Sequence, residues 1–281
     1  LELRIRTKKL TMPELPEVEI VRRGLEPAMV GQSIDRVILN RPDLRIPFPD
    51  DFVQRIAGQK VEALERRAKY LLCSLGNGAI IIMHLGMSGH FTIHRPSPQS
   101  MELERDLETT HNNTPISSKK PKVTEPEHSP GKHDHVVFVL ADGCRIIYTD
   151  HRRFGLMTIG DKTGLTSHPL LAQAGPEPLS DEFTDSYLSD QLQGRQTPIK
   201  AALLNQTIVA GLGNIYVCEA LYYAGISPKR KAASIPGKRA TRLVTATKDV
   251  LTRAIDAGGS TLRDYAHTDG NLGYFQHSFS V

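Results

Sequence analysis

The stretch MPELPEVE at residues 12–19 places a proline and a carboxylate side by side at a possible chain start. If the chain begins at Met12 and this methionine is removed, Pro13 carries a free secondary amine next to Glu14. An α-amino group titrates far below a lysine, so it can attack a sugar C1′ near neutral pH and form an iminium ion. That ion stays cationic and draws electrons from neighbouring C–O bonds, while Glu14 can transfer protons. The alternative is a proline-rich helix start, because Pro and Glu both favour a first helical turn.

Basic side chains at a regular spacing form a second candidate in the stretch RRAKYLL, residues 66–72. A strand has a period of two residues, so Arg67 and Lys69 are expected on one face of it. Such a pair could contact an anion, and the alternative is a solvated strand edge.

A glycine-rich turn, Gly211-Leu212-Gly213-Asn214, opens a predicted helix. A dinucleotide-binding fingerprint would need a third glycine where this chain has Tyr216, so that interpretation fails. Amide groups at a glycine turn and a helix N-terminus form an anion site, and the Asn214 side chain can bind a phosphate oxygen. Tyr216 and Arg195 are further candidates beside it. The alternative is a tight turn that binds nothing.

One helix and several strands must position the N-terminal candidates. Apolar residues recur three or four apart over residues 16–29, and Gly31 follows as a stop signal, so one amphipathic helix is expected there. An Asp-Gly step at residues 142–143 predicts a hairpin between two strands. Many short strands behind one helix predict an antiparallel β-sandwich. Period-2 patterns place the strands at residues 33–40, 60–75, 79–93, 135–140 and 144–148.

The composition then changes twice along the chain. Residues 95–131 contain six prolines with many Ser, Thr and charged residues, which predicts a disordered insertion. After the Gly-Pro-Glu-Pro break at residues 175–178 the pattern becomes helical. The predicted helices cover residues 181–193, a segment with Thr197 as N-cap and Pro198 at its first position, 214–224 and 239–257.

The sequence therefore predicts an α+β protein with two domains. Residues 12–175 form the N-terminal catalytic β-sandwich with its leading helix, and residues 176–281 form a helical domain. Residues 1–11 are expected to be an extension that is not native.

Charge and cysteine usage limit the possible partners. The net charge is only +4, yet residues 195–263 carry eleven Lys and Arg against three acids, a concentration typical of phosphate-backbone binding. No apolar run approaches the about 20 residues that a membrane span requires, and no secretory signal is recognisable. Three isolated cysteines indicate neither a disulfide framework nor a metal knuckle. A cytoplasmic monomer that binds nucleic acid and no membrane is expected.

The run MPELPEVEIVRRGLEP resembles the N-terminus of bacterial formamidopyrimidine-DNA glycosylases, which excise oxidised purines from DNA, and the likeness continues to Val281. The resemblance implies that Pro13 is the Schiff-base nucleophile and Glu14 the proton donor. It implies that Lys69 contacts phosphate beside the lesion and assists strand cleavage. It also implies base-excision repair of damaged double-stranded DNA by a bacterial, nucleoid-associated enzyme with glycosylase and abasic-site lyase activities.

The resemblance also assigns the residues that contact DNA. A glycosylase rotates its target nucleotide out of the stack, so wedges must fill the gap and a donor must bind the orphaned base. The stretches HLGMSG, residues 84–89, and DHRRFG, residues 150–155, match these parts. Met87 and Phe154 match the wedges, Arg152 matches the base reader, and His133 matches a DNA-contacting histidine. At position 151 the family commonly has proline, whereas this chain has His151.

Further along, the likeness extends to the family's helix-two-turns-helix motif. In that motif the residues matching Lys200 and Asn214 bind backbone phosphates, with Arg195 and Tyr216 as possible neighbours.

Relatives continue into a four-cysteine zinc finger that holds one Zn²⁺, and the sequence ends at Val281 without it. We therefore expect no metal site and no cofactor in this chain. The eleven residues before Met12 also depart from the pattern, and a Pro13 nitrogen acylated by Met12 has no nucleophilic lone pair.

Two other functions stay open from the sequence. The related endonuclease VIII type prefers oxidised pyrimidines, although the Met87, Arg152 and Phe154 set favours the purine enzyme. A non-catalytic binder of damaged or abasic DNA is the alternative from another class. Borohydride trapping on an abasic duplex separates an enzyme from a binder.

Overall fold

A computed structural model describes residues 12–96 and 131–259 of the 281-residue chain. The proposed extension at residues 1–11, nearly all of the insertion at 95–131, and the segment from 260 to the end lie outside the described residues. Within the described part, no helix is both long enough and apolar enough to cross a membrane.

Helix α1 (Leu15–Met29) leads the fold, as predicted. It begins in a capping box, in which the Glu14 and Glu17 side chains each bind a backbone N–H at the helix start. Its buried apolar stripe includes Val18, Val21 and Leu25. The helix packs this stripe against the strands, which fixes the direction in which Glu14 points.

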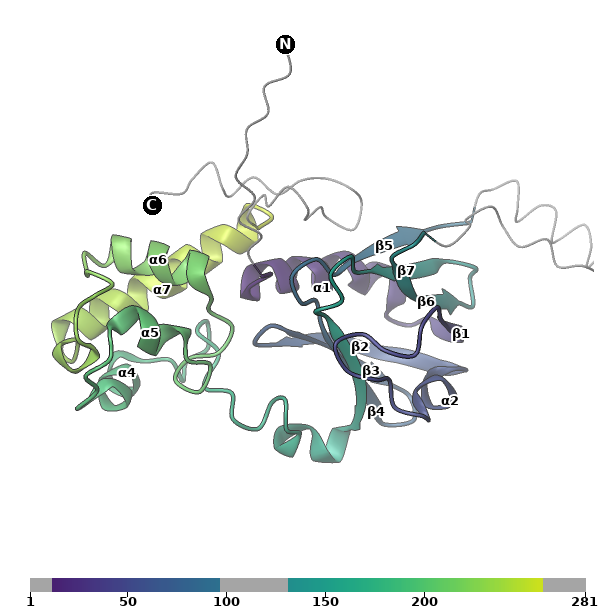
Figure 1. The fold of residues 1–281 in the computed structure, drawn as a ribbon, viewed down its shortest axis with the longest axis horizontal. Helices are drawn as coiled ribbons and strands as arrows, with labels where there is room; N and C mark the ends of the chain where they lie inside the picture. The colour runs from purple at the N-terminus through teal and green to yellow at the C-terminus, as the bar shows by residue number, and fades with distance from the viewer. Residues whose placement is uncertain (1–11, 97–130, 260–281) are drawn as a thin grey trace, which may run out of the picture.

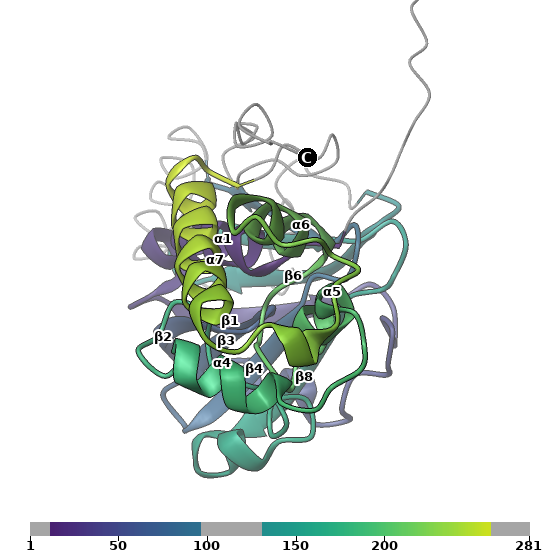
Figure 2. The same ribbon diagram turned by 90° about the vertical axis from the view of Figure 1, so that its left-hand side faces the viewer.

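In the described part of the chain, eight antiparallel strands follow in the order β5-β7-β6-β1-β2-β3-β4-β8, and Figures 1 and 2 show how they are arranged. Strand β1 meets β2 through only two residue pairs, and the two halves of the sheet share one core, to which Phe138 contributes from one half and Leu71 from the other. The α+β sandwich prediction is therefore confirmed. The strands are β1 (Ser33–Leu39), β2 (Gln59–Arg67), β3 (Tyr70–Leu75), β4 (Ala79–His84), β5 (His90–His94), β6 (Asp134–Leu140), β7 (Arg145–Thr149) and β8 (Leu156–Asp161).

Two of the predicted strands are each divided in the structure. The strand expected at residues 60–75 is interrupted at Ala68, whose φ is 53°, so that β2 turns into β3 and Arg67 pairs with Tyr70. Lys69 therefore lies in a turn, and the prediction that it shares a strand face with Arg67 is wrong. The strand expected at 79–93 is broken by the loop 85–89, which carries Met87. A period-2 pattern continues through a tight turn, so it does not reveal the break.

The turn between β6 and β7 agrees with the sequence. Gly143 has a φ of 81° and its N–H donates to the Leu140 carbonyl at 2.9 Å, which is the hairpin expected from the Asp-Gly step. Strand β8 and the short helix α2 (Phe52–Ile56) were not predicted.

The helical part has its own apolar core, built around residues such as Leu203, Val217 and Leu251. Two views show it beside the sandwich, with α7 passing close to α1 (Figures 1 and 2). Thr184 caps its first helix, four residues later than expected, and Pro198 rather than Thr197 flanks the second. The helices are α4 (Asp185–Leu192), α5 (Ile199–Leu204), α6 (Asn214–Tyr223) and α7 (Lys238–Asp256), with 3-10 turns η1 (Lys162–Ser167) and η2 (Ala232–Ser234).

Candidate active site

The carboxylate of Glu14 lies where the sandwich meets the helical part. It is only 2% exposed and rests on the N-terminus of α6, where the Gly213 N–H donates to Oε2 at 2.7 Å and the Ile215 N–H donates to Oε1 at 2.9 Å. The Leu15 N–H donates to the Gly211 carbonyl at 3.0 Å beside it. The amides expected to bind a DNA phosphate thus bind Glu14 instead, which corrects the predicted anion site.

Burial dominates the acidity of Glu14. It raises the pKa of the carboxyl from an ordinary 4.5 to about 7, and the Glu17 charge acts in the same direction. The Lys69 ammonium and the α6 amides oppose this rise in pKa. A carboxyl with a pKa near 7 can both hold and release a proton at neutral pH, which suits it to acid–base catalysis.

Lys69 reaches this site from the turn between β2 and β3. Burial lowers the pKa of its ammonium, while the charges of Glu14 and Glu17 raise it. The two groups therefore interact, although 55 residues separate them in the chain. The structure brings together Glu14 and Lys69, with Pro13 buried directly before Glu14 and Met12 40% exposed.

Glu17 and Tyr216 form a buried support for Glu14. Glu17 Oε2 accepts from the Glu14 N–H at 3.0 Å, and the Tyr216 hydroxyl donates to Glu17 Oε1 at 2.6 Å. Tyr216 is completely buried, so the prediction that its side chain contacts DNA is wrong; it holds Glu17 instead. The sequence does contain a signal for Glu17, because a glutamate three residues after an N-cap is the capping-box spacing.

Gly213 is required by the close approach of Glu14. A Cβ added at Gly213 would lie 2.4 Å from Glu14 Cδ and 2.5 Å from Oε1, inside the carboxylate itself. We expect Gly213→Ala to push the carboxylate away and to lower the single-turnover rate of the reaction proposed below about 100-fold, the loss that a displacement near 1 Å can cause. Gly225→Ala is the matched control for a lost glycine, since nothing lies within 4 Å of its added Cβ, although its φ of 66° strains that variant. Equal rates for wild type and Gly213→Ala would contradict this role.

Two loops lie together at the edge of the sandwich, at residues 85–89 and 150–155. Asp150 is completely buried and joins them, because it accepts hydrogen bonds from the Ser88 hydroxyl and from the Gly155 N–H at 2.9 Å. The Arg152 N–H also donates to Ser88 Oγ at 3.0 Å. A Cβ at Gly86 would lie 2.3 Å from the Phe154 backbone, which shows how closely the loops approach. Asp150 belongs to the DHRRFG stretch, but its type and spacing alone did not predict this joining role.

These loops present three of the predicted DNA contacts. Phe154 is 44% exposed, Arg152 is exposed with its guanidinium 4.7 Å from the Phe154 ring centroid, and Met87 is half-buried. Met87 lies in a loop. On a strand, its side chain would be expected to belong to the core. The resemblance implies that the stretches at residues 84–89 and 150–155 act together, and the structure places them side by side.

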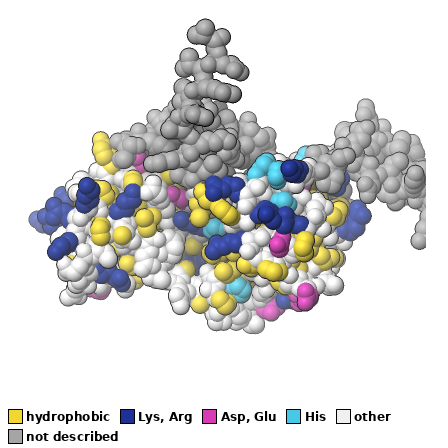
Figure 3. Space-filling model, viewed as in Figure 1, with side chains coloured by type: hydrophobic (Ala, Val, Ile, Leu, Met, Phe, Trp, Pro, Cys, Tyr) yellow, Lys and Arg dark blue, Asp and Glu magenta, His cyan; other side chains and the backbone are white. Residues whose placement is uncertain are grey.

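Histidines lie beside the Arg152 loop. The ring centroids of His133 and His151 are 4.3 Å apart, and His90 lies 6.4 Å from His151. Partial burial lowers the pKa of His133, and the neighbouring His151 and Lys132 lower it further. Histidine side chains and basic side chains are close together on this part of the surface (Figure 3).

The predicted phosphate contacts lie on the helical part, whose surface carries many Lys and Arg side chains (Figure 3). Asn214 and Arg195 are exposed, and Lys200 is half-buried on α5. Arg195 Nε donates to the Gln191 carbonyl at 2.5 Å, so it closes its own helix end. Three separate segments therefore carry these residues: the turn after α4, the first turn of α5 and the start of α6.

No group of three or more His, Cys, Asp or Glu side chains within residues 12–96 and 131–259 is arranged to hold a metal ion. The three cysteines are free thiols, with Cys73 and Cys144 buried in the sandwich.

Comparison with known proteins decides the family. The sequence model of the formamidopyrimidine-DNA glycosylase N-terminal domain matches residues 12–157, and that of the formamidopyrimidine-DNA glycosylase H2TH domain matches residues 174–266. The chain belongs to the formamidopyrimidine-DNA glycosylase family. The formamidopyrimidine-DNA glycosylase of Methylocella silvestris is 50% identical over 96% of this chain and 88% of its own. That of Rhodospirillum rubrum is 51% identical over 96% of this chain and 86% of its own.

Solved structures of formamidopyrimidine-DNA glycosylases share the fold. The MutM (Fpg) protein of Thermus thermophilus has a TM-score of 0.75 at 34% identity, covering 95% of this chain and 85% of that one. A Lactococcus lactis Fpg mutant in complex with DNA containing Fapy-dG has a TM-score of 0.78 at 30% identity, covering 95% and 86%. The resemblance inferred from the N-terminal motif is therefore confirmed over both domains.

Proposed function

We propose that this protein removes oxidised purines from duplex DNA and then cuts the strand at the abasic site. The observation that carries the proposal is the placement of Glu14, buried directly after Pro13, with a pKa of about 7 and with Lys69 acting on it. Family membership supplies the substrate class, and relatives at about half identity favour the purine enzyme over the endonuclease VIII type.

The reaction needs an amine, a proton source and an elimination that cuts the strand. The Pro13 nitrogen attacks C1′ and the bond from C1′ to the base breaks, with its electron pair going to the base and the proton of the Pro13 N–H neutralising that base. Glu14 gives its proton to the ring oxygen as the nitrogen lone pair opens the C1′–O4′ bond and forms the iminium ion. The Glu14 carboxylate then takes a proton from C2′, and the electrons of that C–H bond pass to the iminium ion. Those electrons then expel the 3′ phosphate, which cuts the strand.

Lys69 supplies a positive charge next to this chemistry. Its ammonium acts on Glu14 and is held by the β2–β3 turn. A phosphate placed beside C1′ would therefore lie near the Lys69 ammonium as well as near Glu14. The exposed Arg152 and Phe154, with Met87 nearby, are suited to the base opposite the lesion and to the gap left by the rotated nucleotide.

Arg152→Ala is expected to reduce discrimination between cytosine and adenine opposite the lesion, because one bidentate contact carries about 1–3 kcal/mol of base choice. Arg152→Lys is the matched control, since it keeps the charge but loses the planar fork. Phe154→Ala should weaken binding for every opposing base. The excision rate with each opposing base tests the Arg152 variants, and the affinity for each of these duplexes tests Phe154→Ala. An unchanged preference in Arg152→Ala would remove Arg152 as the base reader.

The function itself is tested with protein whose chain begins at Pro13. Duplexes containing 8-oxoguanine, an oxidised pyrimidine or an abasic site are incubated with it, and released base and cut strand are measured. Release of 8-oxoguanine with strand cleavage supports the proposal. Preference for the pyrimidine would indicate the endonuclease VIII type, and binding without product would indicate a non-catalytic binder.

We also infer that the protein works as a monomer on chromosomal DNA in the bacterial cytoplasm, because its relatives are bacterial and its substrate is duplex DNA. Members of this family are expected to hold one Zn²⁺ in a C-terminal four-cysteine finger, and the proposed reaction uses only Pro13, Glu14 and Lys69.

A further inference from the structure

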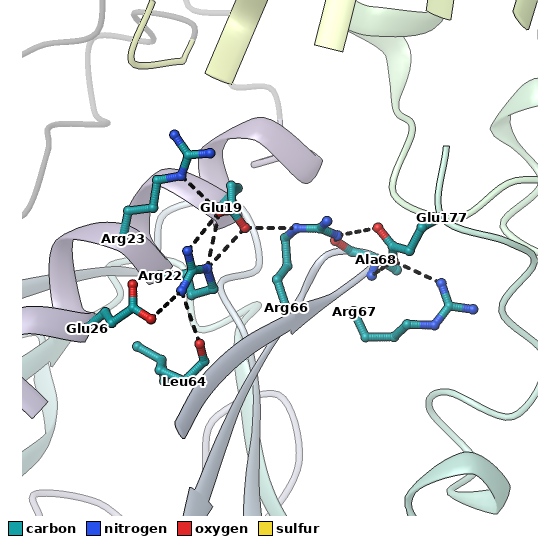
Figure 4. Close-up of polar contacts among 9 residues, drawn as sticks. All are labelled: Glu19, Arg22, Arg23, Glu26, Leu64, Arg66, Arg67, Ala68 and Glu177. Carbon is teal, nitrogen blue, oxygen red and sulfur yellow. Dashed lines mark hydrogen bonds and ion pairs between the residues drawn. The ribbon is translucent and has the colours of Figure 1, made fainter. Parts of the chain in front are cut away.

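Ala68, directly before Lys69, has a backbone conformation that is unusual for its type. Its φ of 53° is in the left-handed region, which is strained for a residue that carries a Cβ. Both polar groups of this residue's backbone have side-chain partners: the Ala68 N–H donates to Glu177 Oε1 at 2.5 Å, and Arg66 Nη1 donates to the Ala68 carbonyl at 3.0 Å (Figure 4). These contacts hold the turn in place.

Glu177 is the centre of the surrounding ion pairs. Arg66 Nη1 lies 2.6 Å from Oε2 and Arg67 Nη1 lies 2.9 Å from Oε1, so both carboxylate oxygens are engaged (Figure 4). The side chains of Arg66 and Glu177 are only 11% and 20% exposed. Shielding of this kind makes charged hydrogen bonds stronger than those of an exposed surface pair.

Arg66 also connects the turn to the helix that begins with the active site. Its Nε lies 3.4 Å from Glu19 Oε2 on α1, where Arg22 and Arg23 hold the same carboxylate (Figure 4). The β2–β3 turn is thus tied to α1 as well as to Glu177.

The segment that carries Glu177 is fixed to the helical part at the same time. The Ala210 N–H donates to the Pro176 carbonyl at 3.0 Å, which joins the segment to the helical part. Arg67 Nη2 donates to the Ala174 carbonyl at 2.8 Å, which joins the same segment to β2. Gly211 and Gly213, which follow in the same loop, contact Leu15 and Glu14. A continuous path of contacts therefore runs from Lys69 through Glu177 to Glu14.

We propose that Glu177 is a positioning residue for the active site, fixing the left-handed turn that presents Lys69 to Glu14. The proposal rests on the proposed function, because its assay measures that reaction. The contacts that carry it are those of Glu177, which is separate from the reacting groups. Glu177 touches no reacting atom and acts through Lys69. A loss of Glu177 frees the turn to relax from its strained conformation, which moves the ammonium away from Glu14.

The direction in which the pKa of Glu14 changes separates this role from a general loss of structure, because loss of structure would expose the carboxyl and lower its pKa. The charged groups that act on Glu14 are Lys69 from the turn and Glu17 from α1, and Tyr216 from α6 hydrogen-bonds to Glu17. Because the Lys69 ammonium lowers the pKa of Glu14, moving it away raises that pKa. The fall in excision at high pH should then shift to higher pH.

The test compares wild type, Glu177→Ala, Glu177→Gln, Lys69→Ala and the double variant Glu177→Ala with Lys69→Ala, all beginning at Pro13. Single-turnover excision of 8-oxoguanine, its pH profile, binding to undamaged duplex and thermal melting are measured. Glu177→Ala should lower the rate about 10- to 100-fold, with duplex binding changed less than about twofold. Glu177→Gln keeps an oxygen for the Ala68 N–H and should recover part of the rate. Glu182→Ala, an exposed acid nearby, is the matched control.

A role through Lys69 predicts that Glu177→Ala changes the rate little in the Lys69→Ala background, since coupled residues are not additive. Additive losses in the double variant, or a pH profile that does not move, would overturn the proposal. An inactive wild type would instead contradict the proposed function, so the two failures are distinguishable.

Discussion

A protein whose chain begins at Pro13 is expected to form a borohydride-trappable covalent complex with an abasic oligonucleotide, whereas one that retains Met12 should form none. The reason is electronic, because a peptide bond to Met12 delocalises the Pro13 nitrogen lone pair into a carbonyl. Glu14 cannot restore that lone pair, however well it is placed. The difference is therefore between efficient trapping and no trapping at Pro13.

Lys69 is the competing amine in this experiment. Burial lowers the pKa of its ammonium, while Glu14 and Glu17 oppose that change, so its amine loses a proton more readily than that of an ordinary lysine. Any trapping by the longer protein should be slow and should vanish in Lys69→Ala. The adduct is located by peptide mass. Efficient trapping by the longer protein at a residue other than Pro13 would overturn the mechanism.

Glu14→Gln is expected to lower the single-turnover excision rate by about 10²–10⁴-fold, the range that one general acid contributes. In wild type, excision requires the protonated carboxyl, so the rate should fall as pH rises through about 7, the raised pKa of Glu14. The variant has no titrating group at this position, so its excision rate should not show this fall at high pH. Excision rates measured between about pH 5 and pH 9 give both results. If the variant shows the same fall in excision rate as the wild type, the titration belongs to another group.

Glu14 should also affect stability in a pH-dependent way. Its pKa rises from 4.5 in the unfolded chain to about 7 in the folded protein, so the folded state binds the proton more tightly. The resulting stability is fully present below about pH 4.5 and is lost as pH rises through about 7. The melting temperature of the wild type should fall as the pH rises across this window. In Glu14→Gln the part of this fall that comes from the titration of Glu14 should disappear.

The same variant has a cost that does not depend on pH. Both oxygens of Glu14 accept hydrogen bonds from backbone N–H groups, those of Gly213 and Ile215. A glutamine amide would turn one acceptor into a donor that faces a donor, leaving a buried group unsatisfied at about 1–3 kcal/mol. The variant must therefore be assayed below its own melting temperature, with Glu182→Gln as a control on the exposed surface.

Local pattern was sufficient for much of this protein. The apolar stripe and the stop signal at Gly31 predict α1, the Asp-Gly step predicts the hairpin between β6 and β7, and the helical periodicity predicts the second half of the chain. Pro13 and Glu14 are adjacent in sequence, so their chemistry is readable without a fold. The family motif then identified the reaction, because it lies within one continuous stretch.

The remaining features depend on residues that are distant in the chain, and only the tertiary structure decided them. Glu14 occupies the N-terminus of α6 across a separation of 199 residues, which removes the amides from phosphate binding and raises the pKa of the carboxyl by burial. Tyr216 lies in the apolar core of the helical part, and its hydroxyl reaches Glu17 across a separation of 199 residues. Ala68 gives no sequence signal for its left-handed φ, because its conformation is stabilised by Glu177 from another segment. Sequence periodicity records which face of an element is apolar, whereas these contacts arise from how the two domains pack against each other.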